Sequence, residues 1–198
     1  MKKIITFLLL VLLVPTMVFA EEQKYTSQTL EEALKSEEIK GDLSKYNEGE
    51  NKVPIYLFRG QGCSHCHEFL EYVASDLVKE YGDKFELISF EVWNNKTNSD
   101  LMESVSKYLN DDASGVPYIV IGDKSFNGYA ESMNEEIKTA ITDLYNAEEK
   151  YDILTEMKEH PEAKKQTKKQ DSTSVVVFVI FATIAVIALV VNSVKKNS

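Results

Sequence analysis

The chain of 198 residues contains only two cysteines, Cys63 and Cys66, which stand three positions apart. A disulfide that closes so short a loop removes little entropy from the unfolded chain, so it would stabilise a fold poorly. An apolar run of strand length, Val53–Arg59, precedes the pair, and apolar residues recur every three or four positions after it as far as Tyr81. The pair is therefore predicted at the start of a helix that follows a strand, and its role there is chemical.

Both ends of the chain are strongly apolar. Residues 1–20 combine two lysines, an apolar run and a small-residue cleavage pattern, which is typical of a secretory signal peptide. Residues 174–194 are long enough to cross a bilayer as one transmembrane helix and are followed by Lys195 and Lys196 in the tail 195–198. This arrangement predicts a single-pass membrane protein whose central part lies outside the cytoplasm.

The central part divides by composition into three segments. Residues 21–50 are polar, with a short helix expected near 28–40 and Gly41 at its end; residues 51–150 form the main domain; residues 151–173 are a helical or flexible stalk. Between the two apolar ends lie 18 of the 22 basic residues and all 32 acidic residues, a net charge of −14. So acidic a domain is not expected to bind nucleic acid.

Further strands and helices are predicted along the main domain. We expect a strand at 85–93, a polar loop at 94–99, a helix near 101–109, a turn at 114–117, a strand at 118–121 and its hairpin partner at 125–129. Ser132 and Glu135 match a capping box that would open a last helix. The apolar stripe of that helix would comprise Ile137, Ala140, Ile141, Leu144 and Tyr145.

The order of the predicted elements and motifs resembles the thioredoxin-like fold. This order is strand, Cys63-Ser64-His65-Cys66, helix, strand, helix, Val116-Pro117, hairpin and helix. Within that superfamily, residues 51–150 look most like the DsbA-type oxidoreductases. The resemblance implies an α/β domain with a central mixed sheet flanked by helices, here joined to one C-terminal transmembrane helix. It also implies a cis Pro117 against the dithiol and a Val116 backbone that pairs with the substrate chain.

The expected chemistry follows from the helix start. Unpaired N–H groups there favour a thiolate at Cys63, which makes it the nucleophile, and Cys66, one turn later, the resolving thiol. His65 stands between the cysteines as in the oxidising DsbA-type motif, where it stabilises the thiolate and makes the disulfide a stronger oxidant. The redox-active disulfide would need no metal and no other cofactor.

Two departures from the thioredoxin pattern disfavour a reductase. Thioredoxins have tryptophan before the first cysteine, where this chain has Gly62, and an acid on the preceding strand, where Val53–Arg59 has none. The expected function is oxidation or exchange of disulfides in exported proteins, together with a membrane redox partner. A membrane-anchored thiol reductase of the same fold is the alternative. A bacterial cell membrane is the expected location. The tail with Lys195 and Lys196 also fits a dilysine retrieval signal, so a membrane of the eukaryotic secretory pathway is the alternative location.

Two other classes of protein match the same residues. Cys63 to His67 spells the Cys-x-x-Cys-His attachment signature of c-type haem, for which Met102 or Met133 would be an axial ligand. A zinc or copper site would use His65 and His67 with the two cysteines, although four ligands within five consecutive residues cannot easily surround one tetrahedral metal.

Overall fold

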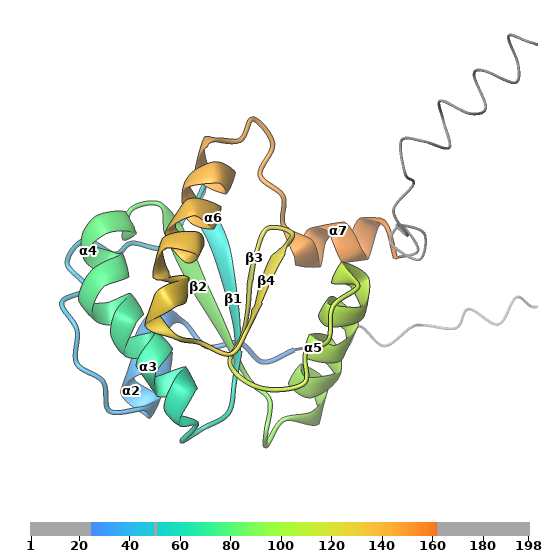
Figure 1. The fold of residues 1–198 in the computed structure, drawn as a ribbon, viewed down its shortest axis with the longest axis horizontal. Coiled ribbons are helices and arrows are strands. Elements are labelled where there is room, and N and C mark those ends of the chain that lie inside the picture. Colours follow the sequence, from blue (N-terminus) through green and yellow to red (C-terminus); the bar gives the residue numbers. More distant parts are fainter. Residues whose placement is uncertain (1–24, 50, 162–198) are drawn as a thin grey trace, which may run out of the picture.

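The computed structural model describes residues 25–49 and 51–161, which form a four-stranded sheet with helices on both faces (Figure 1). The strand order is β2 (Phe85–Glu91), β1 (Val53–Arg59), β3 (Tyr118–Ile121) and β4 (Lys124–Asn127). β1 runs parallel to β2 and antiparallel to β3, and β4 is antiparallel to β3. The predicted mixed α/β sheet is confirmed, and its order is compatible with a thioredoxin-like fold.

The central strand β1 is buried on both faces. Val53, Ile55 and Leu57 belong to one apolar core, whereas Tyr56 and Phe58 belong to the other. Alternation of this kind follows from the two-residue period of a strand. A strand buried on both faces shows a nearly continuous apolar run in the sequence, as this one does.

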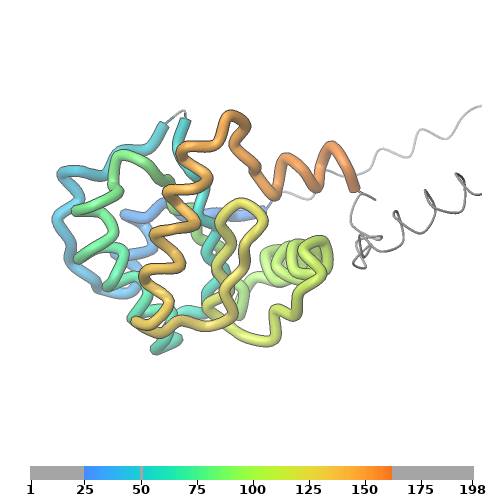
Figure 2. Tube along the Cα trace, turned by 45° about the horizontal axis from the view of Figure 1, so that its top comes forward, coloured from blue at the N-terminus to red at the C-terminus, as the bar shows by residue number. Residues whose placement is uncertain are grey.

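Each core is covered by its own helices. The first lies under α2 (Leu30–Ser36), α6 (Asn134–Asn146) and a long helix made of α3 (Ser64–Tyr72), the π-helical stretch η1 (Val73–Leu77) and α4 (Val78–Tyr81). The second lies under α5 (Lys96–Leu109) and α7 (Ile153–Glu159). Figures 1 and 2 show α5 and α7 together, on the side away from α3 and α4.

Packing of the domain extends beyond residue 150. Ile153 at the start of α7 is fully buried in the second core. The hydroxyl of Tyr56 on β1 donates a hydrogen bond to Asp152 at 2.8 Å. Asp152 is also the N-cap residue of α7, so one carboxylate joins the last described helix to the central strand.

The first helix is shorter than the sequence predicts. α2 begins after Thr29, which forms a capping box with Glu32, and it ends at Ser36. Gly41 does not end this helix but lies against the long one, where an added Cβ would stand 2.7 Å from the Cβ of Ala74. The glycine therefore allows close packing of the connecting segment.

The polar stretch 94–99, predicted as a loop, is largely helical. Asn95 is the N-cap residue of α5 and accepts a hydrogen bond from the backbone N–H of Asn98 at 3.1 Å. Asn98 is itself buried, and its amide donates to the carbonyls of Thr26 and Glu91. A first turn with polar residues has no apolar repeat, so periodicity alone places the helix start too late.

Two further details differ from the sequence-based expectation. The capping box of Ser132 and Glu135 is wrong, because Ser132 lies in a 3-10 turn, η2 (Glu131–Met133), and α6 starts at Asn134 without a side-chain cap. Tyr145 is exposed and does not belong to the buried stripe of α6. The ammonium groups of Lys84 and Lys150 lie over its ring at 5.9 and 5.1 Å from the centroid.

No helix within residues 25–49 and 51–161 is long and apolar enough to span a membrane. The predicted signal peptide, 1–20, and the predicted transmembrane helix, 174–194, both lie outside the described residues.

Candidate active site

The cysteine pair lies at the carboxyl end of β1, where a short turn leads into α3. The backbone N–H of Cys63 donates to the carbonyl of Gly60 at 3.2 Å and closes this turn. Gly62 has φ +75°, a conformation that residues with a side chain rarely adopt. Cys63 is the N-cap residue of α3, which confirms the predicted position of the pair between a strand and a helix.

The two sulfur atoms form a disulfide but differ in exposure. The Cα atoms of Cys63 and Cys66 are 5.2 Å apart, and Cys63 is 8% exposed whereas Cys66 is 0% exposed. The backbone N–H of Cys66 is directed at Sγ of Cys63 at 3.3 Å. Because free N–H groups at a helix start favour negative charge, this amide would stabilise a Cys63 thiolate once the disulfide opens.

A segment distant in the sequence lies beside the exposed sulfur. The carbonyl oxygen of Val116 is 3.6 Å from Sγ of Cys63, although the two residues are 53 positions apart. The Val116–Pro117 peptide bond is cis. The carbonyl of Pro117 accepts a hydrogen bond from the N–H of Gly128 at 2.8 Å, which ties this segment to the end of the β3–β4 hairpin.

His65 lies outside this group of contacts. Its side chain is 63% exposed, and its Nδ1 is 3.1 Å from Oε2 of Glu68 on the next turn of α3. The negative charge of a carboxylate at this distance partly cancels the electric field of a cationic imidazole. Any electrostatic effect of His65 on Cys63 would therefore be reduced by Glu68.

The side chains that a haem or a metal ion would need are engaged in other interactions in the structure. Nε2 of His67 lies 3.4 Å from Oε1 of Glu71, so both histidines face acids on α3. Across the described ranges, no three His, Cys, Asp or Glu side chains are grouped so that they could hold a metal ion. The two sulfurs are bonded to each other, and neither is free in this form for the thioether of an attached haem.

Trp93 lies next to the cysteine turn, whereas the sequence predicts it within the strand 85–93. β2 ends at Glu91, and the indole packs so closely on Gly60 that an added Cβ there would be 2.1 Å from the ring. The side chain is still 59% exposed. Because β1 and β2 are parallel, their carboxyl ends meet at one edge of the sheet, and this rule would have placed Trp93 near the site.

A buried cation ends β1 just before the cysteine turn. The guanidinium of Arg59, whose side chain is 1% exposed, forms an ion pair with Glu37 at 2.5 Å. It also donates to Gln28, Ser36 and Ser89 at 2.7 to 3.0 Å. Burial lowers the pKa of Arg59, and the nearby carboxylate of Glu37 opposes that change. The network joins the residues at the two ends of α2 to β1 and β2, immediately before the cysteine turn in the sequence.

The fold and the site together define an α/β protein with a Cys-x-x-Cys disulfide at the start of a helix, an arrangement compatible with the thioredoxin-like class. Comparison of the chain with protein-family models, with curated proteins and with solved structures finds no significant match. The assignment of function therefore rests on the geometry of the site.

Proposed function

We propose that the protein is an extracytoplasmic thiol–disulfide oxidoreductase of DsbA type, an enzyme that oxidises or exchanges disulfides in exported proteins. One observation carries the proposal. Cys63, the more exposed residue of the pair at 8% against 0% for Cys66, lies at a helix start with the N–H of Cys66 and the carbonyl of Val116 both close to its sulfur. Two cysteines that served packing alone would need neither neighbour.

The reaction proceeds in two exchange steps. A client thiolate attacks Sγ of Cys63, the bond between Cys63 and Cys66 breaks, and Cys66 leaves as a thiolate that takes up a proton. A second client thiolate then attacks the client sulfur of the mixed disulfide, and Cys63 leaves as a thiolate. Two electrons pass from the client to the protein, whose disulfide is restored by an oxidising membrane partner.

The backbone beside Cys63 suits the binding of an extended client. The carbonyl of Val116 faces the sulfur, so the N–H of a residue next to the client cysteine can donate to it. Main-chain pairing of this kind accepts many sequences, because it uses groups that every residue except proline has. Pro117 holds this segment through its hydrogen bond with Gly128.

The electron flow that we propose is from client to protein. The amide of Cys66 stabilises the thiolate and hence the reduced form, and this raises the reduction potential by about 30 mV for each 1.4 kcal/mol. β1 contains no carboxylate that could accept a proton from Cys66 and favour reduction of clients. The buried charge at the end of β1 is the cation of Arg59, which is already paired with Glu37.

We place the enzyme at the cell membrane, anchored by residues 174–194 with the cysteines outside the cytoplasm. That side of the membrane permits disulfides to persist. The redox partner is then a membrane oxidase, whereas a reducing direction would require a thiol-reducing membrane protein.

The equilibrium potential of the Cys63–Cys66 couple tests the direction. The full-length chain is equilibrated with glutathione buffers of graded composition, and free thiols are trapped by alkylation and counted. We expect a potential clearly less negative than the value of about −270 mV for thioredoxin, and faster oxidation of a reduced unfolded client than reduction of insulin. A potential at or below that of thioredoxin would make the protein a reductase. The double variant Cys63→Ser with Cys66→Ser is the inactive control.

Two single variants measure the part played by His65. His65→Ala removes the imidazole and should lower the potential. Glu68→Gln leaves the imidazole but removes its carboxylate partner, and it should raise the potential. Equal potentials in both variants and the wild type would show that His65 takes no part in the redox balance.

A further inference from the structure

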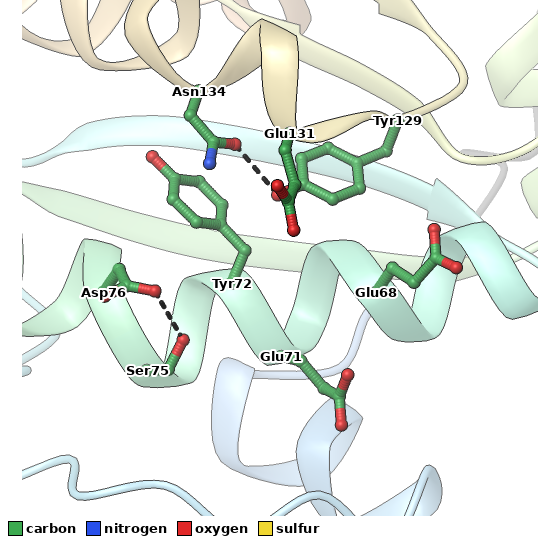
Figure 3. A pocket seen from close by; sticks show the side chains of 8 residues that line it. All are labelled: Glu68, Glu71, Tyr72, Ser75, Asp76, Tyr129, Glu131 and Asn134. Carbon is green, nitrogen blue, oxygen red and sulfur yellow. Dashed lines mark hydrogen bonds between the residues drawn. The ribbon is translucent and has the colours of Figure 1, made fainter.

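An acidic groove runs along α3 away from the cysteines. It has a volume of about 450 Å³ and lies between the helix and the segment that connects β4 to α6 (Figure 3). Four of its lining residues are carboxylates and none is lysine or arginine; the lining comprises Glu68, Glu71, Tyr72, Ser75, Asp76, Tyr129, Glu131 and Asn134. The groove is therefore suited to a cationic occupant.

Two of the carboxylates have no cationic partner of their own. Glu68 and Glu71 pair with His65 and His67, whereas neither Asp76 nor Glu131 forms an ion pair within the described residues. Asp76 only accepts a hydrogen bond from Ser75 at 2.8 Å. The negative charges of Asp76 and Glu131 are thus available to a ligand.

A buried hydroxyl in the wall of the groove is also unsatisfied. Tyr72 is 7% exposed, and among the described residues its hydroxyl has no hydrogen-bond partner. Figure 3 shows its ring rising from α3 toward Asn134 and Glu131 on the opposite wall. The neighbouring Tyr129, stacked on it with ring centroids 5.8 Å apart, already donates to Asn134 at 2.8 Å. The hydroxyl can both donate and accept, so a ligand side chain with a hydrogen-bonding group that reaches it would give it a partner.

The groove is connected to the active site on both walls. On α3, Glu68 contacts His65, which lies between the two cysteines. On the other wall, Tyr129 follows Gly128, whose N–H bonds to the carbonyl of Pro117, the residue after Val116, whose own carbonyl lies 3.6 Å from Sγ of Cys63. A polypeptide attached to Cys63 can therefore continue into the groove.

The length of helix between Cys63 and the carboxylates determines which residue of a bound client would contact them. Glu68 and Asp76 follow Cys63 by five and thirteen positions, which at about 1.5 Å per residue places them roughly 7 to 20 Å along the long helix formed by α3 and η1. An extended chain covers that distance in about two to six residues, at about 3.3 Å each. The contact would therefore involve a side chain a few residues from the client cysteine.

We propose that this groove selects clients with an arginine or lysine about two to six residues from the cysteine that Cys63 attacks. The inference rests on the proposed function and names its substrate class. A basic side chain of the client is favoured over a bound metal ion, because within the described residues no three acidic, His or Cys side chains are arranged to hold a metal.

The test uses single-cysteine peptides that differ only in an Arg, Gln or Glu four residues from the cysteine. Each reduced peptide reacts with the oxidised full-length protein; its thiolate bonds to Sγ of Cys63, and Cys66 leaves as the thiolate. The rate of mixed-disulfide formation is divided by the rate of the same peptide with the neutral 2-hydroxyethyl disulfide, which removes differences in peptide thiol reactivity. We expect the Arg peptide to react at least about threefold faster than the Glu peptide at low salt, and the ratio to approach one near 0.5 M salt.

Matched variants locate the effect. Asp76→Asn with Glu131→Gln should reduce the ratio to near one, and Tyr72→Phe should reduce it in part. Glu103→Gln with Glu159→Gln removes two exposed charges from α5 and α7 on the opposite face, and it should leave the ratio as in the wild type. Thermal unfolding of every variant checks that the fold is retained.

Two failures can be told apart. A ratio of one in a wild-type protein that exchanges readily with all three peptides, or equal losses in the groove and control variants, would overturn the inference alone. Absence of exchange with every peptide and with 2-mercaptoethanol would overturn the proposed function, and the inference with it.

Discussion

Cys63 and Cys66 share one bond but not one environment. Cys63 is 8% exposed and its Sγ lies 3.3 Å from the backbone N of Cys66 in α3, whereas Cys66 is 0% exposed. A nucleophile must be accessible and must be stabilised as an anion, and a resolving thiol needs only to reach its partner. At the scale of single residues, this asymmetry supports the proposal that Cys63 is the nucleophile and Cys66 the resolving thiol.

Trapping of mixed disulfides checks the assignment. Cys66→Ser should accumulate client proteins bonded to Cys63, because no second thiol remains to release them. Cys63→Ser should trap few or none, because the remaining thiol is buried. The two variants are expressed in parallel, and mixed disulfides are compared by non-reducing electrophoresis after acid quench. Equal trapping by both would contradict the assignment.

Arg59 is the residue whose loss should most destabilise the region of the site. Arg59→Met would leave the carboxylate of Glu37 buried, at 6% exposure, without its counter-ion. Removal of one partner from a buried pair costs about 3–5 kcal/mol, so we expect a loss of that order in the free energy of unfolding from urea titration. The double variant Arg59→Met with Glu37→Leu should lose less than the single one.

An exposed pair is the matched control for this prediction. Lys107→Met breaks the ion pair of Lys107 with Glu103 on the surface of α5, and it should change stability far less. If Arg59→Met and Lys107→Met lowered the free energy of unfolding by similar amounts, the buried network would contribute no more to stability than an exposed ion pair.

At the scale of elements, one carboxylate joins the end of α5 to the β3–β4 hairpin. Asp111 accepts hydrogen bonds from Ser125 at 2.6 Å, from Tyr118 at 3.3 Å and from Asn127 at 3.3 Å. The pKa of Asp111 is lowered, above all by the hydrogen bond from Ser125, although burial opposes the change. The ionised form thus contributes to the position of the hairpin.

The sign of the pH dependence follows from that lowered pKa. The contribution of Asp111 is fully present above the unfolded-state pKa of about 3.9 and is lost as pH falls through the lower folded-state value. Asp111→Asn should therefore reduce the free energy of unfolding at pH 7, and its difference from wild type should shrink below about pH 4. Urea titrations from pH 3 to 7 measure this, with Asp112→Asn, an exposed neighbour, as control. A difference constant over the whole range would mean that packing, not charge, is responsible.

At the scale of the whole molecule, the described domain includes α7, and its stability depends on that helix. Ile153 fills the second core, and Asp152 accepts from Tyr56 on the central strand. A domain that ended at residue 150 would lose both contacts. It would also uncover the apolar residues of α5 and the sheet that α7 covers.

Two fragments test this boundary. A chain of residues 21–161, which lacks residues 162–198, should fold and keep the exchange activity. A chain of residues 21–150 should be less stable by about 2–5 kcal/mol, the range for loss of a buried isoleucine side chain. Thermal unfolding and the rate of exchange with a small thiol are measured on both. Equal stability of the two fragments would show that α7 adds nothing to the core.

The sequence by itself determined the parts that depend on local pattern. The strands Val53–Arg59 and Tyr118–Ile121, and the helix start at Cys63, appear where alternation, periodicity and glycine breaks predict them. The mixed sheet with helices on both faces was expected from the resemblance of this order to the thioredoxin-like fold. Local pattern was less reliable at helix ends, as Ser132 and Gly41 show, because there a single contact outweighs the periodicity.

Only the tertiary structure decided which distant residues meet. The carbonyl of Val116 lies beside Cys63, Trp93 packs on Gly60, and Glu37 forms an ion pair with Arg59. The two residues of each pair are far apart in the sequence and meet only because of the way the elements pack. The resemblance led to an expectation for Val116, but nothing in the sequence pointed to the partners of Arg59 or to the acidic groove. The physical reason is that periodicity records which face of an element is buried, whereas the identity of the neighbour across the core depends on how all the elements pack together.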